Sequence, residues 1–236
     1  MGKVAELVRQ SVWIIIPAKN EVDTIGLVVE EIKASCECPI VVVNDGSADE
    51  TAAAARQAGA IVLEPVLPLG AWGATQAGIR YAHAWGGDIV ITMDADGQHE
   101  SEAVPDLLRL LQDRTADVVI GACPQRASML RRMAWAIFRR MSGFKFEDLT
   151  SGFRAYNRAA MEVLISEEAT LLDYQDIGVL ILLRKAGLRI AEVPVPMYPR
   201  MAGKSRIFSS WFAVGWYMVK TAVLCLARWR VENPRM

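Results

Sequence analysis

Several features that would assign a protein class at once are scarce in this chain. Its 236 residues include four cysteines and two histidines, and the formal net charge is −1. The cysteine spacings fit neither a zinc site nor a paired disulfide framework, which favours a reducing cytoplasm. A nearly neutral chain also has no overall field that attracts nucleic acid. We therefore expect neither a zinc protein, a disulfide-stapled secreted domain nor a nucleic-acid binder.

Targeting and membrane-spanning segments are equally hard to find. Residues 1–10 mix charged and apolar residues without a signal-peptide h-region. No stretch of about twenty residues is both apolar and uncharged. No internal repeat or low-complexity linker divides the chain. We expect one catalytic domain over residues 1–208, followed by an apolar helix and a basic tail over residues 209–236.

What the chain does contain is a regular alternation of short apolar runs and helical patterns. Proline 17 is expected to end the first run, and the pattern becomes less regular after Gly121. Strands alternating with helices at this spacing predict an α/β protein with a mostly parallel sheet. The predicted strands are 12–16, 39–43, 61–63, 89–93 and 118–120, and the predicted helices are 21–34, 49–59, 74–84 and 104–112.

The fourth predicted strand ends in an acidic cluster. Asp94 and Asp96 follow it directly, and Gln98 comes two residues later. In open α/β sheets, ligands bind beyond the carboxyl ends of the strands. Carboxylate and amide oxygens suit Mg²⁺ or Mn²⁺, although the same residues also cap helices. We expect the neighbouring His99 to pack or to cap the turn rather than to bind metal.

Four further polar turns fall where this topology would place a ligand. The first two open helices, and helix capping is the alternative explanation for each. The last is basic and contains a glycine, which suits a phosphate-binding loop, although a solvated basic loop has the same composition. The turns read Pro17-Ala-Lys-Asn20-Glu21, Asn44-Asp45-Gly46-Ser47, Leu149-Thr-Ser151-Gly152-Phe-Arg154 and Arg200-Met-Ala-Gly203-Lys204-Ser-Arg206.

In this order and spacing, the five motifs resemble the family 2 glycosyltransferases. The nearest branch contains dolichyl-phosphate mannose synthase and bacterial polyprenyl-phosphate glycosyltransferases, and the similarity runs from about residue 11 to about residue 208. The resemblance implies a GT-A fold, a UDP- or GDP-linked sugar donor and a divalent metal, Mg²⁺ or Mn²⁺. It places five residues around the nucleoside: Pro17, Ala18, Asn20, Glu21 and Asp45. It places Asp94, Asp96 and Gln98 at the metal and diphosphate, and Arg200 and Lys204 over the diphosphate. Ser151, Gly152 and Arg154 would line the sugar and acceptor cleft.

The resemblance also suggests catalytic residues, which we take to be Asp96, Arg154 and Asp176. Asp176 lies where many family members carry a Glu-Asp pair that supplies the base, but it is also placed to cap a helix. A phosphate acceptor is already largely ionised at pH 7 and needs a base less than a hydroxyl does. Asp148 and Asp173 are the substitutes. The sequence departs from the common Asp-Asp-Gly-Ser turn at Asn44.

The leading functional hypothesis is an inverting glycosyltransferase that acts on a polyprenyl phosphate at the cytoplasmic face of the membrane. The alternatives are a family 2 enzyme with a saccharide or other non-lipid acceptor and a non-catalytic sugar-nucleotide binder. A nucleotidyltransferase usually opens its first helix with a glycine-rich loop, which Pro17–Glu21 is not. A dehydrogenase is disfavoured because no Gly-x-Gly-x-x-Gly follows the first strand.

Two segments suggest peripheral attachment to the membrane. Arg131, Arg132, Arg139 and Arg140 lie on a predicted amphipathic helix that can rest on anionic lipid, unless it is a core helix with a solvated back. Residues 207–227 are apolar on nearly every side, with Lys220 inside. We expect an interfacial helix there, one that a neighbouring subunit of a homo-oligomer can share, with packing on the domain or a true membrane span as the alternatives.

Overall fold

The computed structural model describes residues 11–99, 101–126, 135–136, 139–140, 143–172 and 175–198. Within these ranges the chain forms a seven-stranded sheet in the order β3-β2-β1-β4-β6-β5-β7. All neighbouring strands are parallel except at β6, which runs antiparallel to both β4 and β5. The strands are β1 (Val12–Ala18), β2 (Ile40–Asn44), β3 (Ile61–Leu63), β4 (Ile89–Thr92), β5 (Val118–Ala122), β6 (Arg154–Asn157) and β7 (Ile190–Pro194).

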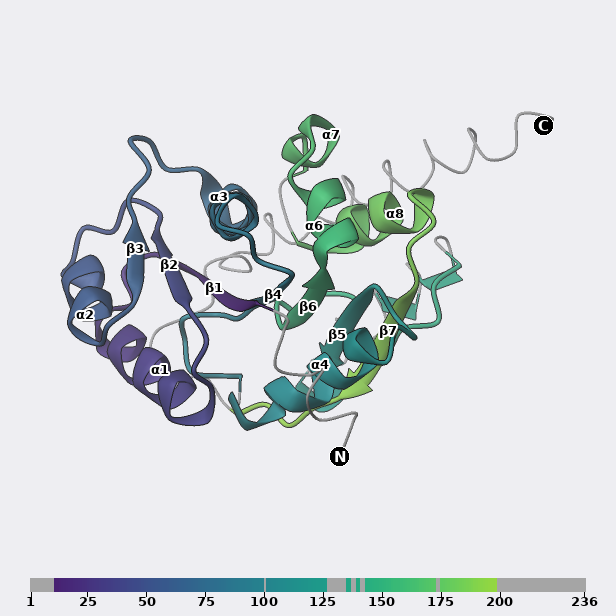
Figure 1. Cartoon of the computed structure of the whole chain (residues 1–236), viewed down its shortest axis with the longest axis horizontal. Helices are drawn as coiled ribbons and strands as arrows, with labels where there is room; N and C mark the ends of the chain where they lie inside the picture. The colour runs from purple at the N-terminus through teal and green to yellow at the C-terminus, as the bar shows by residue number, and fades with distance from the viewer. Residues whose placement is uncertain are drawn as a thin grey trace.

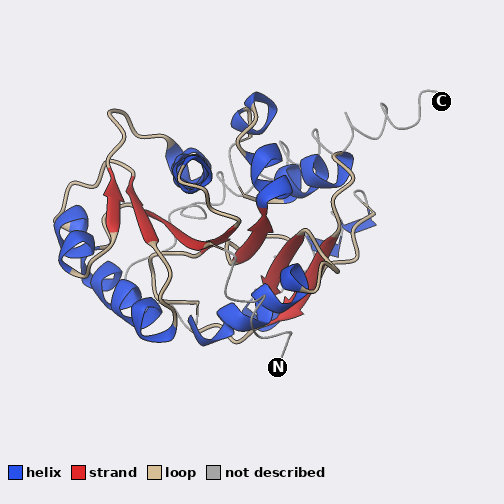
Figure 2. Cartoon of the chain, viewed as in Figure 1, coloured by secondary structure: helices blue, strands red, loops and turns tan. Residues whose placement is uncertain are grey.

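Helices cover both faces of this sheet, which confirms the predicted α/β class (Figures 1 and 2). One face carries α1 (Val22–Ser35), α2 (Thr51–Gln57) and α4 (Val104–Gln112). The opposite face carries α3 (Gly70–Ala84), α6 (Arg158–Leu164) and α8 (Ile177–Lys185), with the short α7 (Glu167–Thr170) beyond α6. No helix in the described ranges is long and apolar enough to cross a membrane.

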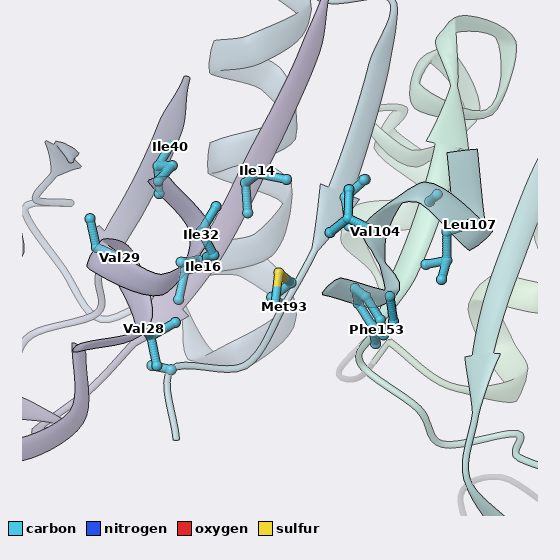
Figure 3. Packing of buried hydrophobic residues seen from close by; sticks show 14 of the residues in the cluster. Ile14, Ile16, Val28, Val29, Ile32, Ile40, Met93, Val104, Leu107 and Phe153 are labelled. Carbon is cyan, nitrogen blue, oxygen red and sulfur yellow. The ribbon is translucent and has the colours of Figure 1, made fainter. Parts of the chain in front are cut away.

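The sequence of the strands explains this layering. In β1, Ile14 and Ile16 face the core under α1, whereas Trp13 and Ile15 face the core under α3. A strand buried on both faces has apolar residues at every position instead of an alternating pattern. Figure 3 shows Val28, Val29 and Ile32 of α1 packed toward β1 and β2, and Val104 and Leu107 of α4 near Phe153.

One expectation from the sequence is wrong. Pro17 does not end the first strand, because β1 continues to Ala18. The carbonyl of Ile15 faces β4 and accepts a hydrogen bond from the N–H of Met93. Pro17 lies two residues further along, so its nitrogen also faces β4, but the pairing of β1 with β4 ends at Ile15. The missing N–H therefore costs no hydrogen bond. The structure also pairs Cys36 with Cys38 as a disulfide, which the cysteine spacings did not predict.

Some predictions fall on residues that the structure does not describe. These are the base substitute Asp173, the two basic-loop residues Arg200 and Lys204, and the apolar helix at 207–227. Of the basic amphipathic helix, only residues 135–136 and 139–140 are described. There Trp135 is buried and Arg140 is exposed, and Arg139 donates to the carbonyl of Phe146 over 3.4 Å.

Candidate active site

Three of the predicted ligand-binding turns meet at one edge of the sheet. Ala18 at the end of β1 pairs with Asn44 at the end of β2, and Ile15 of β1 pairs with Thr92 at the end of β4. Parallel strands bring their carboxyl ends to the same edge, so the turns that follow them are neighbours. The first two turns and the acidic cluster at 94–98 therefore lie together, as the sequence predicted.

The turn after β1 is bound to the turn after β2. The backbone N–H of Asn20 donates to Ser47 Oγ over 2.8 Å, and Asn20 Oδ1 accepts from the N–H of Ala48 over 2.6 Å. The N–H of Glu21 donates to Thr51 Oγ1 over 2.8 Å. Asn20 has a φ of 49°, a left-handed conformation that asparagine tolerates better than most residues. These bonds hold the two proposed nucleoside-binding turns as one unit.

Asp45 in the second turn organises the start of α3. Its Oδ1 accepts from the N–H of Leu69 over 2.5 Å, and its Oδ2 accepts from the N–H of Gly70 over 3.1 Å. A carboxylate is favourable there because the first N–H groups of a helix have no partner within the helix. Asp45 is buried at this turn and ties the donor side of the site to α3.

The acidic cluster after β4 is held by side chains from outside it. Thr24 of α1 donates its hydroxyl to the carbonyl of Ala95 over 2.8 Å. His99 Nδ1 accepts from the N–H of Asp94 over 3.0 Å, its Nε2 lies 3.6 Å from Asp94 Oδ2, and its ring stacks on Phe153. His99 thus packs and caps the turn, as expected. The Asp94 side chain is 42 % exposed, whereas Asp96 is only 2 % exposed.

The two aspartates suit a metal that shares its ligands with a substrate. Asp96 Oδ1 accepts from the N–H of Gln98 over 3.1 Å, which places both side chains in one tight turn. In the described part of the chain, no three His, Cys, Asp or Glu side chains form a closed metal cage. Mg²⁺ is usually bound by one or two carboxylates, with waters and substrate phosphates completing its shell. Asp94, Asp96 and Gln98 fit that pattern.

Gly152, in the turn at residues 149–154, lies against Asp94. A Cβ added to Gly152 would stand 2.7 Å from Asp94 Oδ1, closer than any real contact. Arg154 is fully buried and donates to the carbonyls of Ser151 over 2.8 Å and of Leu149 over 2.9 Å. Its guanidinium therefore shapes the turn, while its predicted catalytic role stays a prediction. The turn thus places Gly152 beside the acidic cluster.

Asp148, an alternative to Asp176 as the base, has its carboxylate bonded to backbone N–H groups of neighbouring loops. Its Oδ1 accepts from the N–H of Thr150 over 3.2 Å, and its Oδ2 accepts from the N–H of Cys123 over 3.5 Å. Glu192 of β7 in turn accepts from the N–H of Asp148 over 2.8 Å. Burial raises the pKa of Glu192 above its ordinary value. These contacts give Asp148 a structural role.

Asp176 is the N-cap of α8. Its Oδ1 accepts from the N–H of Gly178 over 3.0 Å. This is the helix-capping role that the sequence left open as an alternative to the base. Asp176 is also partly exposed, so capping does not prevent a second role. Whether it is the base stays a prediction.

Sequence reasoning missed the side chains that support the site. Thr24, Thr92 and Gln175 each form hydrogen bonds to a segment that carries a predicted site residue. Gln98 was predicted as a metal ligand, but its contact with the segment before Arg200 was not predicted. The backbone carbonyl of Gln98 accepts a hydrogen bond from the N–H of Tyr198 over 2.9 Å. A polar residue at the end of an apolar strand, as at Thr92, was the only signal available.

Known proteins resemble this chain in both sequence and fold. It is 30 % identical over 234 residues to the undecaprenyl-phosphate mannosyltransferase of Micrococcus luteus, covering 91 % of this chain and 92 % of that protein. It is 28 % identical to the polyprenol monophosphomannose synthase of Mycolicibacterium smegmatis, covering 95 % and 88 %. A structure of glucosyl-3-phosphoglycerate synthase from Mycobacterium tuberculosis with Mn²⁺, UDP and phosphoglyceric acid shares the fold, with a TM-score of 0.71, 23 % identity and coverage of 96 % and 81 %.

The sequence profile of the family described as Glycosyl transferase family 2 matches residues 13–169. This match covers more than half of the chain and includes the turns after β1, β2 and β4 and the turn at 149–154. The sheet and its helices have the GT-A architecture of the structural relatives. The chain therefore belongs to glycosyl transferase family 2 and is a glycosyltransferase.

Proposed function

We propose that this enzyme transfers a sugar from a nucleotide-diphosphate sugar to a polyprenyl phosphate, with inversion at the anomeric carbon and with a divalent metal. The observation that carries the proposal is the placement of Asp94 and Asp96 beyond β4, beside Gly152 and the turns after β1 and β2. Carboxylates in that position suit the diphosphate of a donor whose nucleoside lies over the neighbouring turns.

The chain's own residues have separable roles in this proposal. Asp94, Asp96 and Gln98 hold the metal, which when bound stabilises the diphosphate leaving group as a Lewis acid. Asn20, Glu21 and the Asp45 turn bind the nucleoside. Hydrogen bonds hold the turn after β1 on the turn after β2, and Asp45 holds the second turn on the start of α3. Arg200 and Lys204 supply positive charge for the diphosphate. Thr24 and His99 keep the acidic turn in place.

A lipid phosphate as acceptor is supported by the names of the relatives. The similarity to the undecaprenyl-phosphate mannosyltransferase extends over 91 % of this chain and so includes its acceptor half. A relative from Methanococcus voltae is named as a dolichyl-phosphate N-acetylglucosaminyltransferase. Such an acceptor lies in a membrane, so the enzyme would work as a peripheral protein on the cytoplasmic face. The phosphate would itself be the nucleophile, with Asp176 as the candidate base.

The acceptor class can be tested by product analysis. The protein is incubated with UDP- and GDP-linked sugars, Mn²⁺ and undecaprenyl phosphate, and the extracted lipid is analysed by mass spectrometry and NMR. We expect a glycosyl phosphoryl polyprenol whose anomeric configuration is opposite to that of the donor. A glycosylated saccharide in a parallel reaction with no lipid product would contradict the lipid acceptor. Retention of configuration would contradict the inverting reaction.

A further inference from the structure

A single side-chain amide joins three segments of the candidate site. Gln175 Nε2 donates to Thr92 Oγ1 over 2.8 Å and to Tyr156 Oη over 2.6 Å. Thr92 ends β4 and is 1 % exposed, and Tyr156 lies in β6 and is completely buried. Gln175 itself directly precedes Asp176, the N-cap of α8. The loop before α8 is thereby fastened to two neighbouring strands of the sheet.

The contacts continue from Thr92 to the acidic cluster. Thr92 Oγ1 donates to the carbonyl of Gly152 over 2.7 Å. Gly152 lies against Asp94, where an added Cβ would stand 2.7 Å from Oδ1. Thr92 is also only two residues before Asp94 in the chain. One polar cluster therefore connects the segments that carry Asp94, Gly152 and Asp176.

The direction of these hydrogen bonds explains why a primary amide is present. The single hydroxyl hydrogen of Thr92 is used by Gly152, so its oxygen must accept from Gln175. A primary amide has two N–H donors, one for each hydroxyl oxygen, whereas an ionised carboxylate has none. Burial raises the pKa of Tyr156, so its hydroxyl remains protonated and neutral near pH 7. Glutamate at position 175 has the same shape but could not donate to Thr92, so it would break the pattern there.

Gln175 is not needed to hold α8 itself on the sheet. Val179, Leu182 and Leu183 are buried in the core beneath α3 and α6, and burial of such side chains supplies most of the stabilisation of a helix. The Gln175 amide instead joins the loop before α8 to the end of β4, two residues before Asp94.

We propose that Gln175 is a positioning residue for sugar transfer. It keeps the start of α8, with Asp176, in a fixed place relative to the Asp94 carboxylate. The inference rests on the proposed function. It implies that loss of the amide impairs transfer to the acceptor while binding of the nucleotide is retained, because none of the nucleoside-binding turns bonds to Gln175 in the described part of the chain.

The test compares Gln175→Ala and Gln175→Glu with Gln76→Ala. Gln76 is a suitable control because it is 1 % exposed and its Nε2 donates to the carbonyl of Leu164 over 2.7 Å, away from the acidic cluster. Misplacement of a reacting group by about 1 Å can cost about 100-fold in rate. We expect both Gln175 variants to lower kcat about 10- to 100-fold. Their affinity for UDP or GDP with Mn²⁺ should equal that of the wild type, and Gln76→Ala should lower stability without lowering kcat.

A second measurement does not require activity. Amide hydrogen exchange of nucleotide-free protein should become faster at residues 176–180 in Gln175→Ala, and should stay unchanged there in Gln76→Ala. Unchanged exchange in Gln175→Ala, or wild-type kcat in both Gln175 variants, would overturn the inference. So would an equal loss of kcat in Gln175→Ala and Gln76→Ala. A wild-type protein that transfers no sugar would instead refute the proposed function, and the exchange data would still decide the role of Gln175.

Discussion

At the scale of single residues, one substitution can separate the capping role of Asp176 from its proposed role as the base. Its carboxylate caps α8 through Gly178, and it is the candidate base. Asparagine is as good an N-cap as aspartate but cannot take up a proton. Asp176→Asn should therefore keep the melting temperature and lower kcat about 10²- to 10⁴-fold if Asp176 is the base. Near wild-type turnover with unchanged donor affinity would show that Asp176 is only a cap. Asp176→Ala is the control, because it removes the capping side chain and should lower the melting temperature.

The sequence predicts which candidate site residues lie near one another where they belong to local motifs. Asp94, Asp96 and Gln98 are close in the chain, and Asn20 and Asp45 each follow an apolar strand, so topology alone places them at one sheet edge. Gln175 and Thr24 could not be predicted in the same way. Their partners, Thr92 and Ala95, are 83 and 71 residues away, and only the folded structure brings them together.

At the scale of elements, Asp117 fastens the end of the sheet that lies opposite the site. At the start of β5, its Oδ2 accepts from the N–H and Nε of Arg189 over 2.9 and 3.0 Å, and its Oδ1 accepts from Asn157 Nδ2 over 3.0 Å. These bonds join β5, β6 and β7. The hydrogen bonds from Arg189 hold the pKa of Asp117 below its ordinary value.

This shift makes the contribution of Asp117 to stability depend on pH. Because its pKa is lower in the folded than in the unfolded chain, the stabilisation is complete above the unfolded pKa of about 3.9 and is lost as the pH falls through the folded value. Asp117→Asn should lower the melting temperature by about 2–4 °C at pH 7, an effect of the size expected for one moderate substitution in a chain of this length.

Thermal unfolding of Asp117→Asn and wild type between pH 3 and 7 would measure this difference. The difference between the two melting temperatures should become smaller toward the acidic end. Asp106→Asn is the control, because the Asp106–Arg109 pair is exposed and contributes little. A difference that is the same at every pH would show that the ionised carboxylate of Asp117 is not the cause.

The elements also show where prediction from sequence ends. Strands β1 to β5 and helices α1 to α4 were predicted within a few residues, because runs such as 40–44 are apolar throughout. β6 reads Arg-Ala-Tyr-Asn, which has no strong strand pattern. It is a strand because it fits antiparallel between β4 and β5, with the buried Arg154 bonded to its own turn. Pairing of this kind depends on distant parts of the chain, so local sequence does not reveal it.

At the scale of the whole molecule, the layout of the sheet divides the site into two halves. The donor half lies at the ends of β1, β2 and β4, and its turns are bound to one another. The acceptor half comes from the turn before β6 and the loop before α8. α3 connects the two, because its start is bound by Asp45 and its Trp72 Nε1 donates to the carbonyl of Ala169 in α7 over 2.7 Å. In the proposed function, donor and acceptor would meet at Asp94 and Asp96.

In the proposed function, these aspartates support metal-dependent transfer of a sugar to a lipid phosphate. The most direct measurement is release of the nucleoside diphosphate from the sugar donor, with and without Mn²⁺ and undecaprenyl phosphate, in wild type and Asp96→Ala. We predict release only when metal and lipid are both present. Asp96→Ala should lower it about 100-fold or more while the protein stays folded, because metal stabilisation of a leaving group is worth several kcal/mol. Full release in excess EDTA would contradict the metal dependence, and equal release without the lipid phosphate would contradict the lipid acceptor.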